Sequence, residues 1–91
     1  MKYRFQAARG FWKSFARLPE RQQASAKAAF KVFKANPFDP RLRAHKINSL
    51  SAYYGQTVSA AVIEGDLRAV FYVEGSTVFT VDIGSHAIYR V

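Results

Sequence analysis

The sequence of 91 residues contains no cysteine and only 6 acidic residues. The absence of cysteine excludes disulfide bonds and thiolate metal sites, and it is typical of proteins of the reducing cytosol. No segment approaches the roughly 20 apolar residues that a membrane-spanning helix needs, and the N-terminal residues lack the apolar stretch of a signal peptide. We therefore expect one soluble, cytoplasmic domain over residues 1–91 that makes no contact with a membrane.

The motifs of nucleotide-dependent and metal-dependent enzymes are also absent. The chain has no P-loop, no glycine-rich dinucleotide turn and no HExxH, and its acids are too scattered to hold a divalent ion. Ser85, His86 and Asp82 do not predict a hydrolase triad, because nothing indicates an oxyanion hole or a nucleophile elbow. We expect no metal and no small-molecule cofactor.

Basic residues are abundant: 14 Lys and Arg give a net charge of +8 and a pI near 10.2. In so small a domain this charge indicates an anionic partner, either a nucleic acid or an acidic protein. Like charges also recur at helical spacing, which costs a helix a few tenths of a kcal/mol per pair. These residues are Lys13 and Arg17 in one segment and Lys27, Lys31 and Lys34 in another. The alternative is a solvated basic surface with no partner.

The first third of the chain predicts a strand and two helices. Residues 2–7 alternate apolar and polar side chains, as in a half-buried strand. From about Ala8 the period changes to that of a helix. Pro19 and Glu20 then favour the start of a second helix, which ends before Pro37. The expected buried residues are Phe11, Phe15 and Leu18, flanked by Trp12, and then Ala26, Phe30 and Phe33.

Residues 37–54 are expected to be irregular, with a basic cluster of Arg41, Arg43, His45 and Lys46. Three strands follow, over residues 57–63, 67–74 and 77–83. A turn at residues 64–65 would place Val62 beside Leu67 and Val58 beside Phe71.

For the apolar sets of the last two strands to share a face, their connection needs an odd number of residues or a bulge, and a loop of residues 75–77 would satisfy this. Those sets are Leu67, Ala69, Phe71 and Val73 in one strand and Phe79, Val81 and Ile83 in the next, which leaves Val70 and Val78 as apolar exceptions.

The order β-α-α-β-β-β predicts an α+β fold. We expect two N-terminal helices to pack on one face of a small, mostly antiparallel, four-stranded sheet. By the alternation of its strand, Arg68 would then point to the open face.

A candidate site forms where Gly84 ends the last strand and delivers His86 and Tyr89 to its end. Together with Arg68 and the pair His45 and Lys46, these side chains suit cleavage of RNA without a metal. A base would remove the 2′-hydroxyl proton, cations would stabilise the charged phosphorane, and an acid would protonate the leaving 5′-oxygen. Histidine can serve as acid or base, and arginine can clamp a phosphate.

Each of these residues also has a purely structural interpretation. His86 could cap the sheet end, and Arg68 could pair with Asp82 across the strands. His45 and Lys46 could belong to a solvated loop, and Tyr89 could pack at the core edge with its hydroxyl hydrogen-bonded.

The sequence resembles the toxins of the RelE/ParE superfamily from type II toxin–antitoxin systems. The resemblance rests on LRAVF at residues 67–71, DIGSHAIYR at residues 82–90, and the stretch from LPERQQ to HKI at residues 18–47. It implies the same order of elements, inhibition by a small acidic antitoxin, and, for the RelE-like branch, cleavage of mRNA on the ribosome.

The resemblance also implies roles for single residues. Arg68 would support the scissile phosphate, His86 would act as acid or base, and Tyr89 would stack on or orient a base. We expect RNA-binding roles for Arg41, Arg43, His45, Lys46, Lys27, Lys31, Lys34 and Arg90. Two other classes stay open. One is a ParE-like toxin that poisons DNA gyrase by binding alone, and the other is a basic regulatory protein without toxicity.

Overall fold

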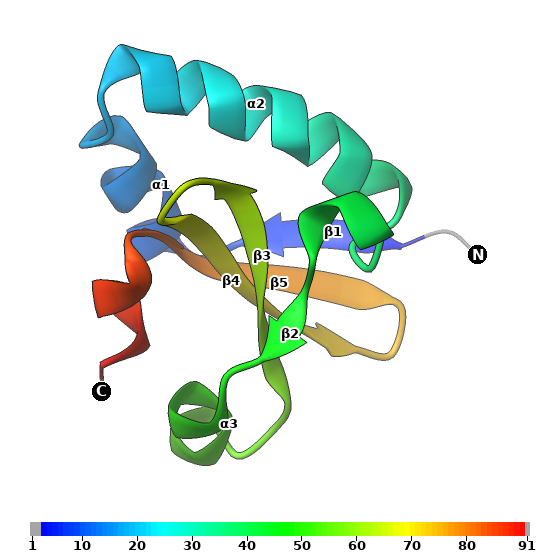
Figure 1. Ribbon diagram of the computed structural model, residues 1–91. Helices are drawn as coiled ribbons and strands as arrows, with labels where there is room; N and C mark the ends of the chain where they lie inside the picture. The colour runs from blue at the N-terminus through cyan, green and yellow to red at the C-terminus, as the bar shows by residue number, and fades with distance from the viewer. Residues whose placement is uncertain (1–2, 91) are drawn as a thin grey trace.

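The computed structural model describes residues 3–90, and it contains a five-stranded sheet with helices on both faces (Figure 1). The strands are ordered β1-β5-β4-β3-β2, and β1 is the one that runs parallel to its neighbour. Their bounds are β1 Arg4–Ala7, β2 His45–Lys46, β3 Val58–Glu64, β4 Leu67–Glu74 and β5 Thr77–Gly84. The α+β class is therefore confirmed, but the expected count of four strands is wrong.

Helices α1 (Arg9–Ala16) and α2 (Glu20–Ala35) cover one face of the sheet, as predicted. The apolar stripes of both helices meet the sheet there. Phe11 and Ala26 pack with Leu67, Ala69 and Ile83, while Phe33 packs with Ala61, Phe71 and Val78. Strand β1 begins at Arg4 among the described residues, and the expected first strand residue Lys2 lies outside them.

The segment expected to be irregular contains most of the elements that the sequence did not reveal. It forms the 3₁₀ turn η1 (Pro40–Leu42), the short strand β2 and helix α3 (Asn48–Tyr54). Strand β2 pairs His45 with Ala60, and Ile47 N donates to Val58 O at 2.8 Å beyond it. Two residues are too short to show an alternating pattern, so β2 depends on the neighbouring strand for its definition.

Helix α3 covers the face of the sheet opposite to α1 and α2 (Figure 1). Leu50 and Ile47 pack there against Val58, Ala60 and Val70. Helix α3 therefore covers part of the face that was expected to be open. This explains why Val70, an apparent exception in the alternating pattern, is buried.

The strand registers differ from those expected by one residue. The β3–β4 turn is Gly65-Asp66, so Val62 lies opposite Arg68 and Val58 lies opposite Tyr72. Gly65 adopts a φ of +46°, a conformation that favours glycine. The expected pairs Val62–Leu67 and Val58–Phe71 are therefore wrong.

The β4–β5 connection is the two-residue turn Gly75-Ser76, and the change of parity comes from a bulge near Val81. The predicted three-residue loop is wrong, while the bulge, its alternative, is present. The bulge divides the apolar set of β5 between the two faces of the sheet. Val78 is fully buried under α2, whereas Phe79 stacks on Tyr72 on the α3 face with ring centroids 5.0 Å apart. A bulge of this kind leaves no signature in hydrophobic alternation alone.

The described part of the chain contains no helix long and apolar enough to span a membrane. The longest helix, α2, has 16 residues and carries four basic side chains, Arg21, Lys27, Lys31 and Lys34.

Phe71 provides a direct test of the core. Its side chain is fully buried on the central strand β4 and contacts Phe33 edge to face, with ring centroids 4.9 Å apart. We expect Phe71→Ala to lower the free energy of unfolding by about 3–5 kcal/mol. Tyr53→Ala, at a side chain that is 67% exposed, should change it by less than about 1 kcal/mol. Urea denaturation measures both, and equal losses would contradict this packing.

Candidate functional site

The candidate site forms at the end of β5, where the chain folds back over the sheet as the 3₁₀ turn η2 (His86–Tyr89). Gly84 permits this return, because a Cβ atom there would lie 2.8 Å from the Ile88 side chain. Ser85 then caps the turn by accepting a hydrogen bond from Ala87 N at 3.2 Å. As a result, η2 lies against the face of the sheet that α3 also covers, and Ile88 and Tyr89 join its apolar cluster.

His86 is held by a carboxylate that we did not predict as a site residue. Its Nδ1 lies 2.8 Å and 2.9 Å from the two carboxylate oxygens of Asp66, in the β3–β4 turn. A carboxylate only accepts hydrogen bonds, so neutral His86 donates from Nδ1 and keeps the lone pair of Nε2 free. Both side chains are exposed, 72% for His86 and 53% for Asp66. The imidazole is therefore oriented and accessible to a ligand.

The pairing changes the titration of Asp66. The hydrogen bond from His86 lowers the pKa of the Asp66 carboxyl below its usual range, and Arg68 adds a smaller effect in the same direction. His86 and Asp66 therefore form a hydrogen-bonded unit that fixes the orientation of the imidazole.

Arg68 is the second residue of the central strand β4, and its side chain lies on the same face of the sheet as α3. Its Nη1 donates to the carbonyl oxygens of Gly65 at 2.6 Å and Leu67 at 3.3 Å, which hold the guanidinium beside the turn that carries Asp66. The residue opposite Arg68 is Gly84, whereas Asp82 lies opposite Val70. Among the described residues, Arg68 forms no ion pair. The alternative in which Arg68 simply pairs with Asp82 across the strands is therefore wrong.

Tyr89 is turned into the molecule rather than out to a ligand. Its ring packs at the edge of the α3-face cluster, and its hydroxyl is buried without a hydrogen-bond partner among the described residues. Burial raises the pKa of Tyr89, and the neighbouring positive charge of Arg68 partly offsets this rise. Ser49 in α3 anchors the backbone by donating to Tyr89 O at 2.9 Å. In this position the half-buried Tyr89 ties η2 to α3 and to the apolar cluster of this face.

His45 brings a second imidazole to the same face of the sheet. It pairs with Ala60, which pairs with Val70 on the strand of Arg68, and directly paired residues project to the same side. His45 Nδ1 lies 3.0 Å from the carbonyl oxygen of Arg43, so its Nε2 is also free. Arg43 adopts a left-handed conformation with φ +47°, which is uncommon outside glycine and marks strained positions near functional sites.

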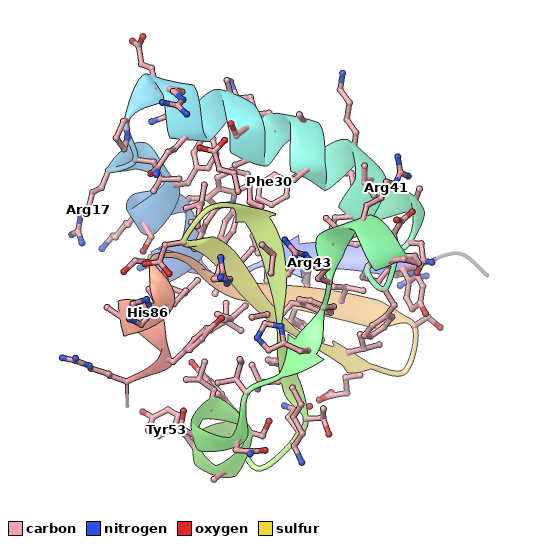
Figure 2. The ribbon with its side chains drawn as sticks, viewed as in Figure 1. Arg17, Phe30, Arg41, Arg43, Tyr53 and His86 are labelled. Atoms are coloured by element: carbon pink, nitrogen blue, oxygen red, sulfur yellow. The ribbon has the colours of Figure 1, made fainter. Side chains whose placement is uncertain are left out.

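The remaining predicted RNA-binding residues fall into three places. Arg41 is already engaged, because its Nε and Nη2 each lie 3.0 Å from the carboxylate of Asp39 and this pairing lowers the pKa of Asp39 to about 2. Lys46 is exposed on β2, and Arg90 is exposed just after η2. Lys27, Lys31 and Lys34 lie on α2, on the other side of the sheet from His86 (Figure 2).

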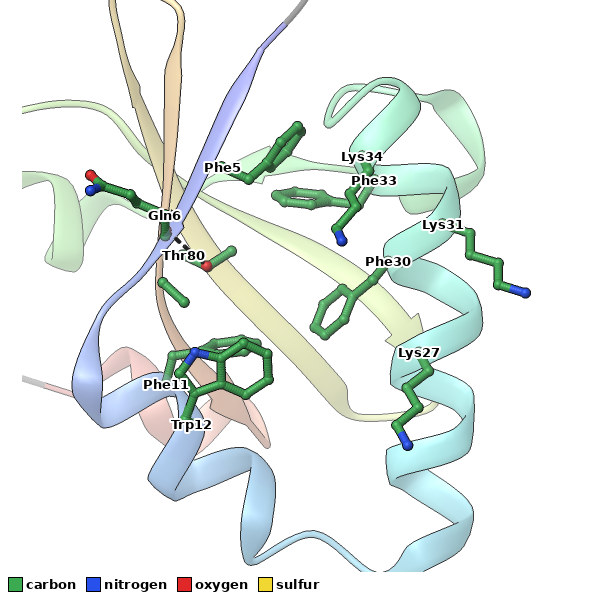
Figure 3. A pocket seen from close by; sticks show the side chains of 11 residues that line it. Phe5, Gln6, Phe11, Trp12, Lys27, Phe30, Lys31, Phe33, Lys34 and Thr80 are labelled. Atoms are coloured by element: carbon green, nitrogen blue, oxygen red, sulfur yellow. Dashed lines mark hydrogen bonds between the residues drawn. The ribbon is translucent and has the colours of Figure 1, made fainter.

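These lysines border a separate feature, which we call the aromatic groove (Figure 3). It is a hollow of about 590 Å³ between α2 on one side and β1 and α1 on the other. Its walls include Phe5, Phe11, Trp12, Phe30 and Phe33. Lys27, Lys31 and Lys34 of α2 also line the groove, and Figure 3 shows the end of the Lys31 side chain extending outward from the helix.

The part of the chain that the structure describes groups no three His, Cys, Asp or Glu side chains in a way that could hold a metal ion. What it does bring together is an anchored imidazole, a carboxylate and a guanidinium. Such a set can transfer a proton and stabilise an anion at one place. Asp66 escaped the sequence analysis because its partner lies 20 positions away, and only the register of the β3–β4 turn brings the two together.

The geometry predicts a specific titration. In the wild-type protein the Asp66 carboxyl should titrate below its usual range, and His86→Ala should raise that pKa by removing the main hydrogen bond to the carboxylate. Because the folded-state pKa is lowered, the pair stabilises the fold at higher pH and this contribution is lost as the pH falls through that value. Carboxyl ¹³C NMR measures the titration. Arg68→Ala should cause a smaller rise, and an unchanged pKa in His86→Ala would contradict the pairing.

Neither a protein-family model nor a curated protein matches this sequence. Solved structures, however, match it over nearly its whole length. YafQ from E. coli strain BL21(DE3) superposes with a TM-score of 0.75 at 14% identity, covering 99% of this chain and 100% of YafQ. A chain of the archaeal RelE–RelB complex from Pyrococcus horikoshii OT3 gives 0.71 at 15% identity, covering 93% and 96%.

A chain of the E. coli DinJ–YafQ toxin–antitoxin complex gives a TM-score of 0.74 at 13% identity, covering 97% of both chains. At these identities the comparisons establish the fold. The chain therefore has the fold of the RelE and YafQ toxins, in agreement with the resemblance of residues 18–47 and 67–90 to that superfamily.

Proposed function

We propose that this protein is the toxin of a type II toxin–antitoxin system and cleaves mRNA on translating ribosomes without a metal ion. The observation that carries the proposal is the His86–Asp66 pair, which lies beside the unpaired guanidinium of Arg68 at the end of the sheet. The RelE and YafQ fold and the sequence resemblance support it further. A protein that only binds its target has no need of an anchored, exposed proton carrier.

The proposed reaction is a transfer within the RNA chain. The 2′-oxygen attacks the adjacent phosphorus, a new P–O2′ bond forms, and the P–O5′ bond breaks. The 2′-hydroxyl loses its proton to a base, and the 5′-oxygen gains a proton from an acid. The products are a 2′,3′-cyclic phosphate and a 5′-hydroxyl, so no water, metal or redox partner is consumed.

His86 suits the role of the acid, because Asp66 holds its imidazole in one orientation through Nδ1 and leaves Nε2 available for proton transfer. His45 suits the role of the base, because its Nδ1 faces a neutral carbonyl and its Nε2 lone pair is free. Arg68 lies between their strands and would stabilise the negative charge that develops on the phosphorane. Tyr89 would act as a positioning residue that supports Arg68 and η2.

The basic residues around this site would bind phosphates on either side of the scissile bond. Arg43 and Lys46 flank His45, and Arg90 follows η2. Contacts of this type fix the position of the RNA and make binding dependent on salt. Arg41 would contribute less, because Asp39 already neutralises its charge.

We expect His86→Gln to lower the rate of mRNA cleavage on translating ribosomes by roughly a hundredfold or more, the usual contribution of general acid–base catalysis. Ribosome binding should persist, because the arginine and lysine contacts to phosphate remain.

Primer extension on a translated message measures the cleavage. Glu74→Gln, an exposed change at the far end of β4, is the control and should cleave like the wild type. Equal cleavage by His86→Gln would remove His86 from the mechanism. Absence of cleavage by the wild type, together with DNA damage in cells, would favour the ParE-like gyrase poison instead.

The same proposal includes a small acidic antitoxin, and the aromatic groove is its candidate docking site. Two of the similar structures are complexes of toxins with RelB and DinJ. In this chain the groove combines apolar walls with lysines on its border, and Trp12 beside it is 57% exposed. An amphipathic segment with acidic residues would bury its apolar side against these walls and place its carboxylates near the lysines.

Reversal of charge at the groove tests this partner. We expect Lys27→Glu with Lys34→Glu to slow association with the proposed acidic antitoxin by about tenfold at low salt, and less at high salt. Arg21→Glu reverses one charge at an exposed position of α2 that does not line the groove, so its effect should be smaller than that of either lysine reversal made alone. Stopped-flow binding measures the rates, and equal effects of the variants would place the partner elsewhere.

A further inference from the structure

A second pocket adjoins the candidate site on the other side of η2. It has a volume of about 370 Å³, within the range of pockets that bind small ligands. Its walls come from α3, which supplies Tyr53 and Tyr54, from the sheet, which supplies Asp82, and from α1. Ile88 of η2 and Arg90 just after it also line the pocket. The pocket thus shares a wall with the turn that carries His86.

The aromatic residues at this pocket form a supported, exposed surface. Tyr54 packs on Tyr72, which stacks on Phe79, with ring centroids 6.2 Å and 5.0 Å apart. Tyr53 lies edge to face on Tyr54 at 5.1 Å, and its side chain is 67% exposed. Figure 2 shows Tyr53 and His86 at the same edge of the molecule. An aromatic ring that contacts a neighbouring ring and is otherwise exposed to solvent is suited to stacking on a nucleobase.

Asp82 gives the pocket a hydrogen-bond acceptor. Its Oδ1 accepts from Ile83 N at 2.9 Å, which fixes the carboxylate, and Oδ2 makes no hydrogen bond within residues 3–90. The Asp82 charge also contributes to raising the pKa of Tyr54, although desolvation of that hydroxyl is the larger cause. A fixed carboxylate accepts hydrogen bonds from exocyclic amines and faces a repulsive contact with a carbonyl oxygen.

The charge of Asp82 argues against a bare phosphate in this pocket, but Arg90 lines the same pocket and offers a cation to a flanking phosphate.

We propose that this pocket is a nucleobase subsite that takes one unstacked base of the RNA beside the scissile phosphate. Tyr53 stacks on the base, and Asp82 favours bases that carry an amine, such as cytosine, over uracil. The inference rests on the proposed function, because it assumes RNA as the ligand.

Cytosine and uracil provide the sharpest comparison, since they have similar ring size and differ only at position 4, where cytosine has an amine and uracil a carbonyl oxygen, and at N3, which carries a proton only in uracil. The experiment uses short 2′-O-methyl oligocytidylate and oligouridylate, which bind but cannot be cleaved because the 2′-oxygen is blocked. Fluorescence anisotropy measures their dissociation constants. We expect the wild type to bind oligocytidylate roughly tenfold more tightly.

Two variants separate stacking from base selection. Tyr53→Ala should weaken binding of both oligonucleotides by roughly tenfold, whereas Phe38→Ala, at an exposed aromatic on the other side of the sheet, should leave both unchanged. Asp82→Asn keeps the acceptor for Ile83 N but adds a donor, so the preference for cytosine should fall to about one. Matching amide NMR spectra away from the pocket would show that each variant is folded.

The outcomes distinguish this subsite from the proposed cleavage. A cytosine preference that Asp82→Asn removes supports the subsite even if no mRNA is cleaved. Equal binding of both oligonucleotides by the wild type, no saturable binding of either, or a preference that survives Asp82→Asn would overturn the subsite, even if cleavage on the ribosome were observed.

Discussion

The central strand β4 is paired along both edges and covered on both faces, and the arrangement of the molecule depends on this burial. Phe71 packs under α2 on one face, while Val70 packs under α3 on the other. Such a strand has little room for polar side chains, so Arg68 emerges where the strand begins, beside the β3–β4 turn. Asp66 in that turn and His86 after β5 reach the same place because the antiparallel strands end there together.

The two faces of the sheet then serve different purposes in our proposal. The α1 and α2 face carries the aromatic groove and its lysines, which suit an acidic, partly apolar protein. The α3 face carries both histidines, Arg68 and the pocket beside Tyr53, which suit RNA. This separation would allow a protein partner to hold one face while the other face stays open to RNA. In this proposal, the positive charge of one face attracts an acidic protein and that of the other face attracts RNA.

Periodicity was sufficient to predict the parts of the fold that have long amphipathic patterns. Helix α2 begins and ends where predicted, and its stripe of Ala26, Phe30 and Phe33 faces the core. Two features had no such pattern. Strand β2 is too short to alternate, and the bulge near Val81 reverses the parity of β5, so that Val78 and not Phe79 faces α2.

The sequence predicted individual residues of the candidate site, but not which of them would lie in contact. Gly84 and the residues after it indicated a functional turn, and the alternation of β4 placed Arg68 on the correct face. The partner of His86 could not be found in this way, because the β3–β4 turn lies one residue beyond its expected position and exposes Asp66 there. For Tyr89, the resemblance implied stacking on or orienting a base, and packing at the core edge was the structural alternative; its ring joins the apolar cluster of the α3 face and its hydroxyl is buried.

The central claim is that this chain cleaves RNA by proton transfer within the RNA itself. The chemistry of the product ends tests it most directly, because attack by the 2′-oxygen leaves a 2′,3′-cyclic phosphate and a 5′-hydroxyl. Messages recovered from translating ribosomes after exposure to the protein can be analysed for these ends by mass spectrometry. The account predicts cyclic phosphates upstream of the cut and 5′-hydroxyls downstream of it. Products with 3′-hydroxyl and 5′-phosphate ends, or messages that remain intact, would contradict it.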